Sequence, residues 1–277
     1  MKKSILYLFL LLNFNVFGVD TLFINRDTLT ITPVFFQKCS FNTSSVFNIK
    51  NAVIDIPLGE EKEFIVFNND ITNHEVNIPN TSGNEIIAPD EAVLIVISNL
   101  DYGTHLMYIE SSVGNFLGAG VTIRVGVEGK KYAWDLWDQD PELTEGFGNG
   151  TYSSLPEVYR PRLFTINGGV EPMEMSSEAM VMGNVGDTIV ISIVNTGNMI
   201  HPLHFHGYHV EIIQATIQTE TVGWSKDSFP VMVKEAMTIR LVPHQPGEFP
   251  VHNHNLIATL FNNGYPKGMV TMLMIEE

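Results

Sequence analysis

The sequence has a single cysteine, Cys39, among its 277 residues. One thiol cannot form a disulfide within the chain, so the fold must depend on packing, and Cys39 is predicted to be a small buried hydrophobic residue. Basic residues are also scarce, because 15 Lys and Arg stand against 31 Asp and Glu and the formal net charge is −16. Such a charge repels nucleic acid and anionic membrane surfaces, so neither is expected as a partner.

No membrane span is expected either. The apolar run at residues 5–12 is shorter than the ~20 residues that a membrane-spanning helix needs. It follows Lys2 and Lys3 and leads to the small residue Gly18. This order is typical of a secretory signal peptide. We therefore expect residues 1–18 to be removed and the protein to be secreted or periplasmic.

The rest of the chain lacks sustained helical periodicity and has the pattern of β-strands. Residues 189–194 are apolar with period-2 alternation and follow a turn at Gly186-Asp187. Turn residues separate similar runs at residues 63–68, 92–98, 121–127, 237–242 and 269–275. Short strands at this spacing predict two antiparallel β-sandwiches.

Two halves of the chain repeat one order of parts, in which a turn and an apolar strand precede a histidine. That histidine is His74 in the first half and His201 in the second. The predicted organisation is an N-terminal domain at 19–128, a linker at 129–159 and a C-terminal domain at 160–277. Asp135 and Asp138, within the linker, are expected to be solvated or to cap turns.

Seven of the nine histidines lie between residues 201 and 254, and four of them form the pairs His204/His206 and His252/His254. Residues two apart on a strand point to one side, ~6.5 Å apart. Four imidazoles converge if the two strands are neighbours, and imidazole is a ligand for copper, zinc, iron and nickel. A lone histidine is most often structural, whereas two pairs of equal spacing favour a metal site.

Two motifs carry a family resemblance. Residues 201–207, His-Pro-Leu-His-Phe-His-Gly, resemble the His-Pro-x-His-x-His-Gly signature of multicopper oxidases. Residues 246–254, Pro-Gly-Glu-Phe-Pro-Val-His-Asn-His, resemble the second signature, in which Pro-Gly precedes His-Cys-His and Gly-Met follows, here at 268–269. The resemblance covers residues 160–277, whereas the first half is only cupredoxin-like. It implies an all-β chain of two cupredoxin-like Greek-key β-sandwich domains.

The resemblance also implies ligands and an assembly. His204 matches a type 2 copper ligand, and His201 matches a type 1 ligand. His206, His252 and His254 match ligands of the type 3 pair. Two-domain relatives hold this cluster between subunits, so we expect a homotrimer, with His74 of a neighbouring subunit as a further candidate ligand. Copper is the expected ion, and imidazole chemistry alone also allows zinc.

The chain departs from the family pattern at the type 1 site, which needs a thiolate and two imidazoles. Asn253 stands at the cysteine position and Ala258 at the position of the last histidine, while Met269 retains the axial position. No type 1 copper is therefore expected. The first half has only His74 and His105 in place of two further His-x-His pairs, so a complete three-copper cluster is not expected.

We therefore expect an exported copper-binding protein of the multicopper oxidase family, with possible oxidoreductase activity on an unknown small-molecule substrate. A non-enzymatic copper carrier is an alternative, because Met173, Met175, Met180 and Met182 form two Met-x-Met pairs that suit Cu(I). Period-2 methionines more often fill a β core.

Two other metal folds remain as alternatives. A cupin-like single-metal protein would use Glu211 as a ligand beside the first histidine pair. A dinuclear zinc hydrolase is disfavoured, since Tyr208 replaces the aspartate that such a motif needs.

Overall fold

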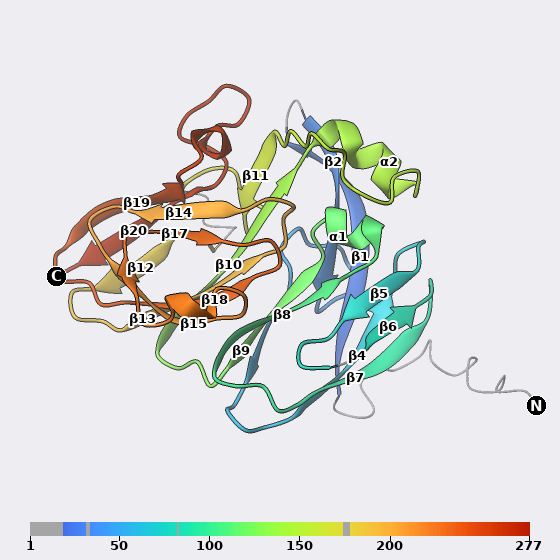
Figure 1. Ribbon diagram of the computed structural model, residues 1–277, viewed down its shortest axis with the longest axis horizontal. Coiled ribbons are helices and arrows are strands. Elements are labelled where there is room, and N and C mark those ends of the chain that lie inside the picture. The colour runs from blue at the N-terminus through green and yellow to red at the C-terminus, as the bar shows by residue number, and fades with distance from the viewer. Residues whose placement is uncertain (1–18, 32–33, 82, 174–177) are drawn as a thin grey trace, which may run out of the picture.

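The computed structural model describes residues 19–31, 34–81, 83–173 and 178–277, and the predicted signal peptide lies outside them. In this part of the chain no helix is long and apolar enough to cross a membrane. The prediction of an all-β fold is confirmed: strands dominate, and the α-helices α1 (Ser112–Phe116) and α2 (Thr144–Gly148) have five residues each. Figure 1 shows the two domains side by side, with β8 and β9 near their junction.

The first domain is a sandwich of two sheets. The four-stranded sheet has the order β2-β1-β4-β7 and the five-stranded sheet the order β3-β9-β8-β5-β6. Their strands are β1 (Asp20–Ile31), β2 (Val34–Asn42), β3 (Val53–Ile56), β4 (Lys62–Asn68), β5 (His74–Asn77), β6 (Asn84–Ile87), β7 (Ala92–Ile97), β8 (Gly103–Ile109) and β9 (Gly120–Val125).

The second domain is also a sandwich, of a six-stranded sheet β11-β10-β13-β18-β15-β16 and a five-stranded sheet β12-β20-β19-β14-β17. Their strands are β10 (Lys130–Gln139), β11 (Leu163–Ile166), β12 (Val181–Asn184), β13 (Ile189–Asn195), β14 (His201–Phe205), β15 (Val210–Ala215), β16 (Ser225–Lys226), β17 (Ser228–Val231), β18 (Ala236–Leu241), β19 (Gly247–Asn253) and β20 (Val270–Glu276). Short 3-10 helices lie at Pro141–Leu143, Thr219–Thr221 and Leu256–Thr259.

Hydrophobic periodicity explains which strands have one covered face and which have two. On β4, Phe64 and Val66 face the core, and the residues between them are partly exposed. Every residue of β13 is buried. One face of β13 lines the second core, and on the other Val194 packs against Leu106 of the first domain. The apolar run at 189–194, interrupted only by the buried Ser192, therefore reflects a strand covered on both sides.

The linker expected at 129–159 needs correction, because residues 130–139 form β10, which pairs with β13 over seven residues. Asp135 and Asp138 of this strand were expected to be solvated or to cap turns, but both are buried. Asp135 accepts hydrogen bonds from Asn51 Nδ2 at 2.7 Å and Thr196 Oγ1 at 2.5 Å. These bonds satisfy the carboxylate inside the protein, so β10 ties the second sheet to the first domain.

Candidate metal centre

The two histidine pairs lie on neighbouring strands. β14 and β19 are antiparallel, and His204 lies directly opposite His252 in their register. His254 follows the end of β19, and its backbone N–H donates to the Pro202 carbonyl at 2.6 Å. The condition for the four imidazoles to converge, that the two strands be neighbours, is therefore met.

The four imidazole rings gather at the surface of the five-stranded sheet of the second domain. The ring centroid of His204 lies 4.7 Å from that of His206, 5.5 Å from that of His252 and 5.5 Å from that of His254. The centroids of His206 and His252 are 5.1 Å apart. His206 and His254 are exposed, and the other two rings are partly buried. The cluster is therefore open to solvent or to another molecule.

Hydrogen bonds to the backbone orient two of these rings. His252 Nδ1 lies 2.9 Å from the Asn253 carbonyl oxygen, and His204 Nδ1 lies 3.2 Å from the Asp227 carbonyl oxygen and 2.7 Å from Ser228 Oγ. A carbonyl only accepts, so each Nδ1 carries the proton and each Nε2 is left with its lone pair. Such an arrangement prepares Nε2 for a metal ion.

The closest pair of donor atoms is His206 Nε2 and His252 Nε2, at 3.0 Å. With metal–nitrogen distances of about 2.0 Å, two tetrahedral ligands lie roughly 3.3 Å apart, so an ion fits after a shift of a few tenths of an ångström. Desolvation lowers the pKa of His206 most, and the neighbouring His204 and His252 lower it further. The lowered pKa favours the neutral ring that a metal requires. The donor set therefore fits a copper or zinc ion.

The cluster is incomplete within one chain. In the part of the protein that the structure describes, the donor atoms of no three of these four histidines lie within 4.8 Å of one another. His206 and His252 can share an ion after the small shift described above, and His204 and His254 flank them. Additional ligands must come from side-chain movement, solvent or another molecule.

The type 1 position is filled by a hydrogen-bonded amide. Asn253 Nδ2 lies 3.0 Å from His201 Nδ1 and 3.2 Å from Met269 Sδ, and all three side chains are buried. The amide thus occupies the place between two residues that match type 1 ligands. Ala258, also fully buried, provides no further imidazole. The residues present do not fit a type 1 copper ion.

The second nitrogen of His201 is also engaged. His201 Nε2 lies 3.0 Å from Asp138 Oδ1, and both side chains are fully buried. Asp138 accepts a further hydrogen bond from the Asn198 backbone N–H at 2.8 Å and one from the Tyr159 hydroxyl at 2.7 Å. Burial and the Asp138 charge raise the pKa of Tyr159 far above its usual range. The expectation that Asp138 is solvated or caps a turn is wrong, because its partners lie 21 and 60 or more residues away in the sequence and enclose it.

His74 lies apart from the four-histidine cluster. It opens β5 in the first domain, is fully buried, and its Nε2 lies 2.8 Å from Asp70 Oδ2. A ring enclosed in this way cannot donate to a cluster on a neighbouring subunit without leaving its core. The structure therefore argues against His74 as a ligand of that cluster.

The other residues singled out in the sequence also have defined places. Glu211 lies on β15, in the six-stranded sheet, and its carboxylate lies 2.5 Å from Arg240 Nη2. The cupin-like alternative therefore lacks its acidic ligand beside the histidines. Met173 and Met182 are 53% and 48% exposed, so the expectation that these methionines fill the core is wrong for both. Met175 lies outside the described residues.

Comparisons with known proteins agree with this architecture. Residues 153–263 match the multicopper oxidase family. A multicopper oxidase of Mycobacterium tuberculosis, MmcO, is 34% identical over 92 residues, which are 33% of this chain and 17% of that relative. The match thus spans less than a fifth of the relative's length.

Two solved structures from Nitrosomonas europaea have the same fold. Its blue copper oxidase superposes with a TM-score of 0.72 at 16% identity, covering 92% of this chain and 85% of the other. Its copper nitrite reductase gives 0.69 at 16% identity, covering 93% of each chain. The predicted pair of cupredoxin-like sandwiches is confirmed. The resemblance to the multicopper oxidase family is confirmed by the sequence match over residues 153–263, and the solved structures show the fold of nearly the whole chain.

Proposed function

We propose that this protein binds copper at the four-histidine cluster of its second domain and has no type 1 copper centre. The observation that carries the proposal is the 3.0 Å approach of His206 Nε2 to His252 Nε2 between two oriented neighbouring rings. Imidazole also suits zinc. Copper is favoured because the family match and both solved relatives are named for copper enzymes.

The residues around the cluster suit chemistry at an exposed site. Bound copper would supply one-electron redox chemistry, as in the family's reduction of dioxygen. His204 and His252 would hold their Nε2 atoms in place through backbone hydrogen bonds, and the exposed His206 and His254 leave room for a small molecule. Because Asn253 replaces the family's cysteine, electrons cannot enter through a type 1 thiolate. A substrate must therefore meet the cluster directly.

An incomplete ligand set at the surface favours a cluster shared between subunits, and we propose a homotrimer. Directly after His254, Leu256 and Ile257 are each 63% exposed and Leu260 is 40% exposed. Apolar side chains exposed beside an open metal site are typical of a subunit interface. Sedimentation equilibrium is expected to give the mass of three chains, and a concentration-independent mass of one chain would exclude this assembly.

We also propose that the chain is exported.

A non-enzymatic copper carrier is the second candidate, since the interrupted electron path leaves binding intact. Oxygen uptake by copper-loaded protein, with a phenol or a cuprous salt as the electron donor, separates the two functions. An oxidase is expected to consume oxygen faster than the same amount of free copper, and the Asn253 amide predicts a slow rate. Uptake equal to that of free copper, with copper still bound, would establish a carrier.

A further inference from the structure

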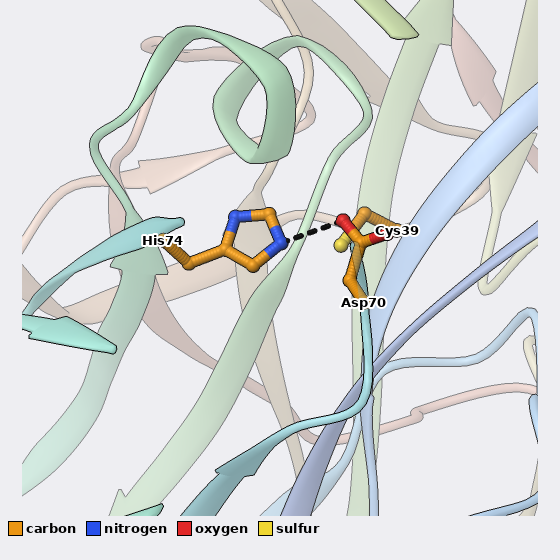
Figure 2. A group of neighbouring side chains, drawn as sticks. All are labelled: Cys39, Asp70 and His74. Atoms are coloured by element: carbon orange, nitrogen blue, oxygen red, sulfur yellow. Dashed lines mark hydrogen bonds and ion pairs between the residues drawn. The ribbon is translucent and has the colours of Figure 1, made fainter. Parts of the chain in front are cut away.

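The first domain contains a second group of metal-binding atoms. Cys39 lies on β2, Asp70 follows β4, and His74 begins β5. The cysteine sulfur, a carboxylate oxygen and an imidazole nitrogen all lie within 4.8 Å of one another, and all three residues are buried. Figure 2 shows the Nε2 edge of His74 facing the Asp70 carboxylate, with the Cys39 sulfur beside it.

The charges around these atoms are balanced within the core. Asp70 Oδ1 lies 2.8 Å from Arg26 Nε, and Asp70 Oδ2 lies 2.8 Å from His74 Nε2 and 2.9 Å from Thr72 Oγ1. Burial is the main cause that raises the pKa of the Cys39 thiol to about 12, and the Asp70 charge is the second cause. The thiol is therefore protonated at neutral pH. The thiol therefore adds no charge beside the Arg26–Asp70 pair.

We propose that Cys39 and His74, with Asp70 as a weaker third ligand, form a second metal site that is selective for Cu(I). A soft thiolate with an imidazole is a donor set that favours Cu(I) over hard cations. Tetrahedral or trigonal metal–ligand distances of about 2.0–2.3 Å place such donors roughly 3.3–4 Å apart. The three atoms are thus within about an ångström of a bound arrangement.

The balance of charge distinguishes Cu(I) from a divalent ion. Binding forms a copper–sulfur and a copper–nitrogen bond and releases the thiol proton to solvent. The His74 proton moves from Nε2 to Nδ1, which has no hydrogen-bond partner among the described residues. One monovalent cation thus replaces one proton, whereas Zn²⁺ would add a net positive charge. An added charge is costly in a buried site whose one carboxylate is already paired with Arg26.

A surface turn gives the ion a route to these buried atoms. Asp70 and His74 are the ends of a five-residue segment in which Ile71 is 82% exposed and Asn73 is also exposed. The side chains that contact the site thus alternate with side chains in solvent. Local opening of this turn exposes Asp70 and His74 without unfolding either sheet.

Cys39→Ser and Cys39→Ala variants of the full protein test the site. Anaerobic Cu(I) is titrated against a coloured Cu(I) chelator, and copper X-ray absorption reports sulfur ligation. We expect the wild type to hold one more Cu(I) per chain than either variant and to be the only one with a sulfur ligand. Equal Cu(I) content in folded variants, or a wild-type spectrum without sulfur, would overturn the proposal. Zn²⁺ binding at Cys39 with equal or higher affinity would overturn the selectivity.

Two further measurements keep the result interpretable. If the Cys39 variants do not fold, alkylation of wild-type Cys39 replaces them: Cu(I) must slow the reaction at least tenfold, and an unchanged rate contradicts the site. A His206→Ala/His252→Ala variant must keep the sulfur-ligated Cu(I), since those residues are in the other domain. Failure of the Cys39 site is thereby separated from failure of the four-histidine cluster.

Discussion

A His206→Ala/His252→Ala variant is expected to lose copper from the second domain. The two Nε2 atoms approach to 3.0 Å, a few tenths of an ångström from the separation of two ligands of one ion. Loss of an outer-shell partner costs ~10–100-fold in metal affinity, so removing two direct ligands should exceed 100-fold. Equilibrium dialysis with Cu(II) and metal analysis of the retained protein measure the effect.

His209→Ala is the matched control for this variant. His209 is exposed and lies three residues after His206, outside the facing pairs. It should bind Cu(II) as the wild type does. His209→Ala should unfold at nearly the wild-type temperature, because substitutions at exposed positions usually change stability by less than ~0.5 kcal/mol, whereas the double variant also loses the partly buried ring of His252 and should lose about 1 kcal/mol more. A double variant that keeps wild-type copper content would show that the ion is held elsewhere.

Asn253→Cys is expected to create a copper–thiolate absorption band that the wild type lacks. The Asn253 amide nitrogen lies 3.0 Å from His201 Nδ1 and 3.2 Å from Met269 Sδ. A thiolate at this position would meet an imidazole and a thioether, which are two of the other three ligands of a blue copper site. The spectrum should differ from that of a complete site because Ala258 replaces the second imidazole.

The matched control is Asn253→Ala, which removes the amide without adding a thiol. It should show no copper–thiolate band with Cu(II) and lose about 1–3 kcal/mol of stability, since His201 Nδ1 is left buried without its donor. A folded Asn253→Cys variant with the same Cu(II) spectrum as Asn253→Ala would contradict the assignment of residue 253 to the ligand position.

Local periodicity was enough to predict the strands that carry the cluster. Each histidine pair spans the end of its strand, β14 or β19, and the residue between its two members, Phe205 or Asn253, is buried on the opposite face. A period of two therefore identified which side chains point to the surface. It did not reveal that the donor atoms of only two rings meet, because side-chain torsions and partners such as Ser228 set that distance.

Contacts between distant parts of the chain could not be predicted in the same way. Asp135 and Asp138 resemble loop residues, yet they are buried in β10 because Asn51, Thr196 and His201 supply hydrogen bonds. The meeting of Cys39 with the Asp70–His74 turn likewise has no sequence signature, since 31 or more residues separate the thiol from its neighbours. The first domain's fold brings Cys39 on β2 next to the turn that joins β4 to β5.

The most direct test is the electron spin resonance and visible spectrum of the full protein loaded with Cu(II). Coordination by the exposed imidazoles predicts splitting from at least two nitrogen ligands, a spectrum without the narrow copper splitting of blue sites, and no intense thiolate absorption. An intense blue band would show that the thiolate of Cys39, the one cysteine of the chain, binds Cu(II) in place of the imidazoles. A signal without nitrogen splitting would show that the four histidines do not hold copper.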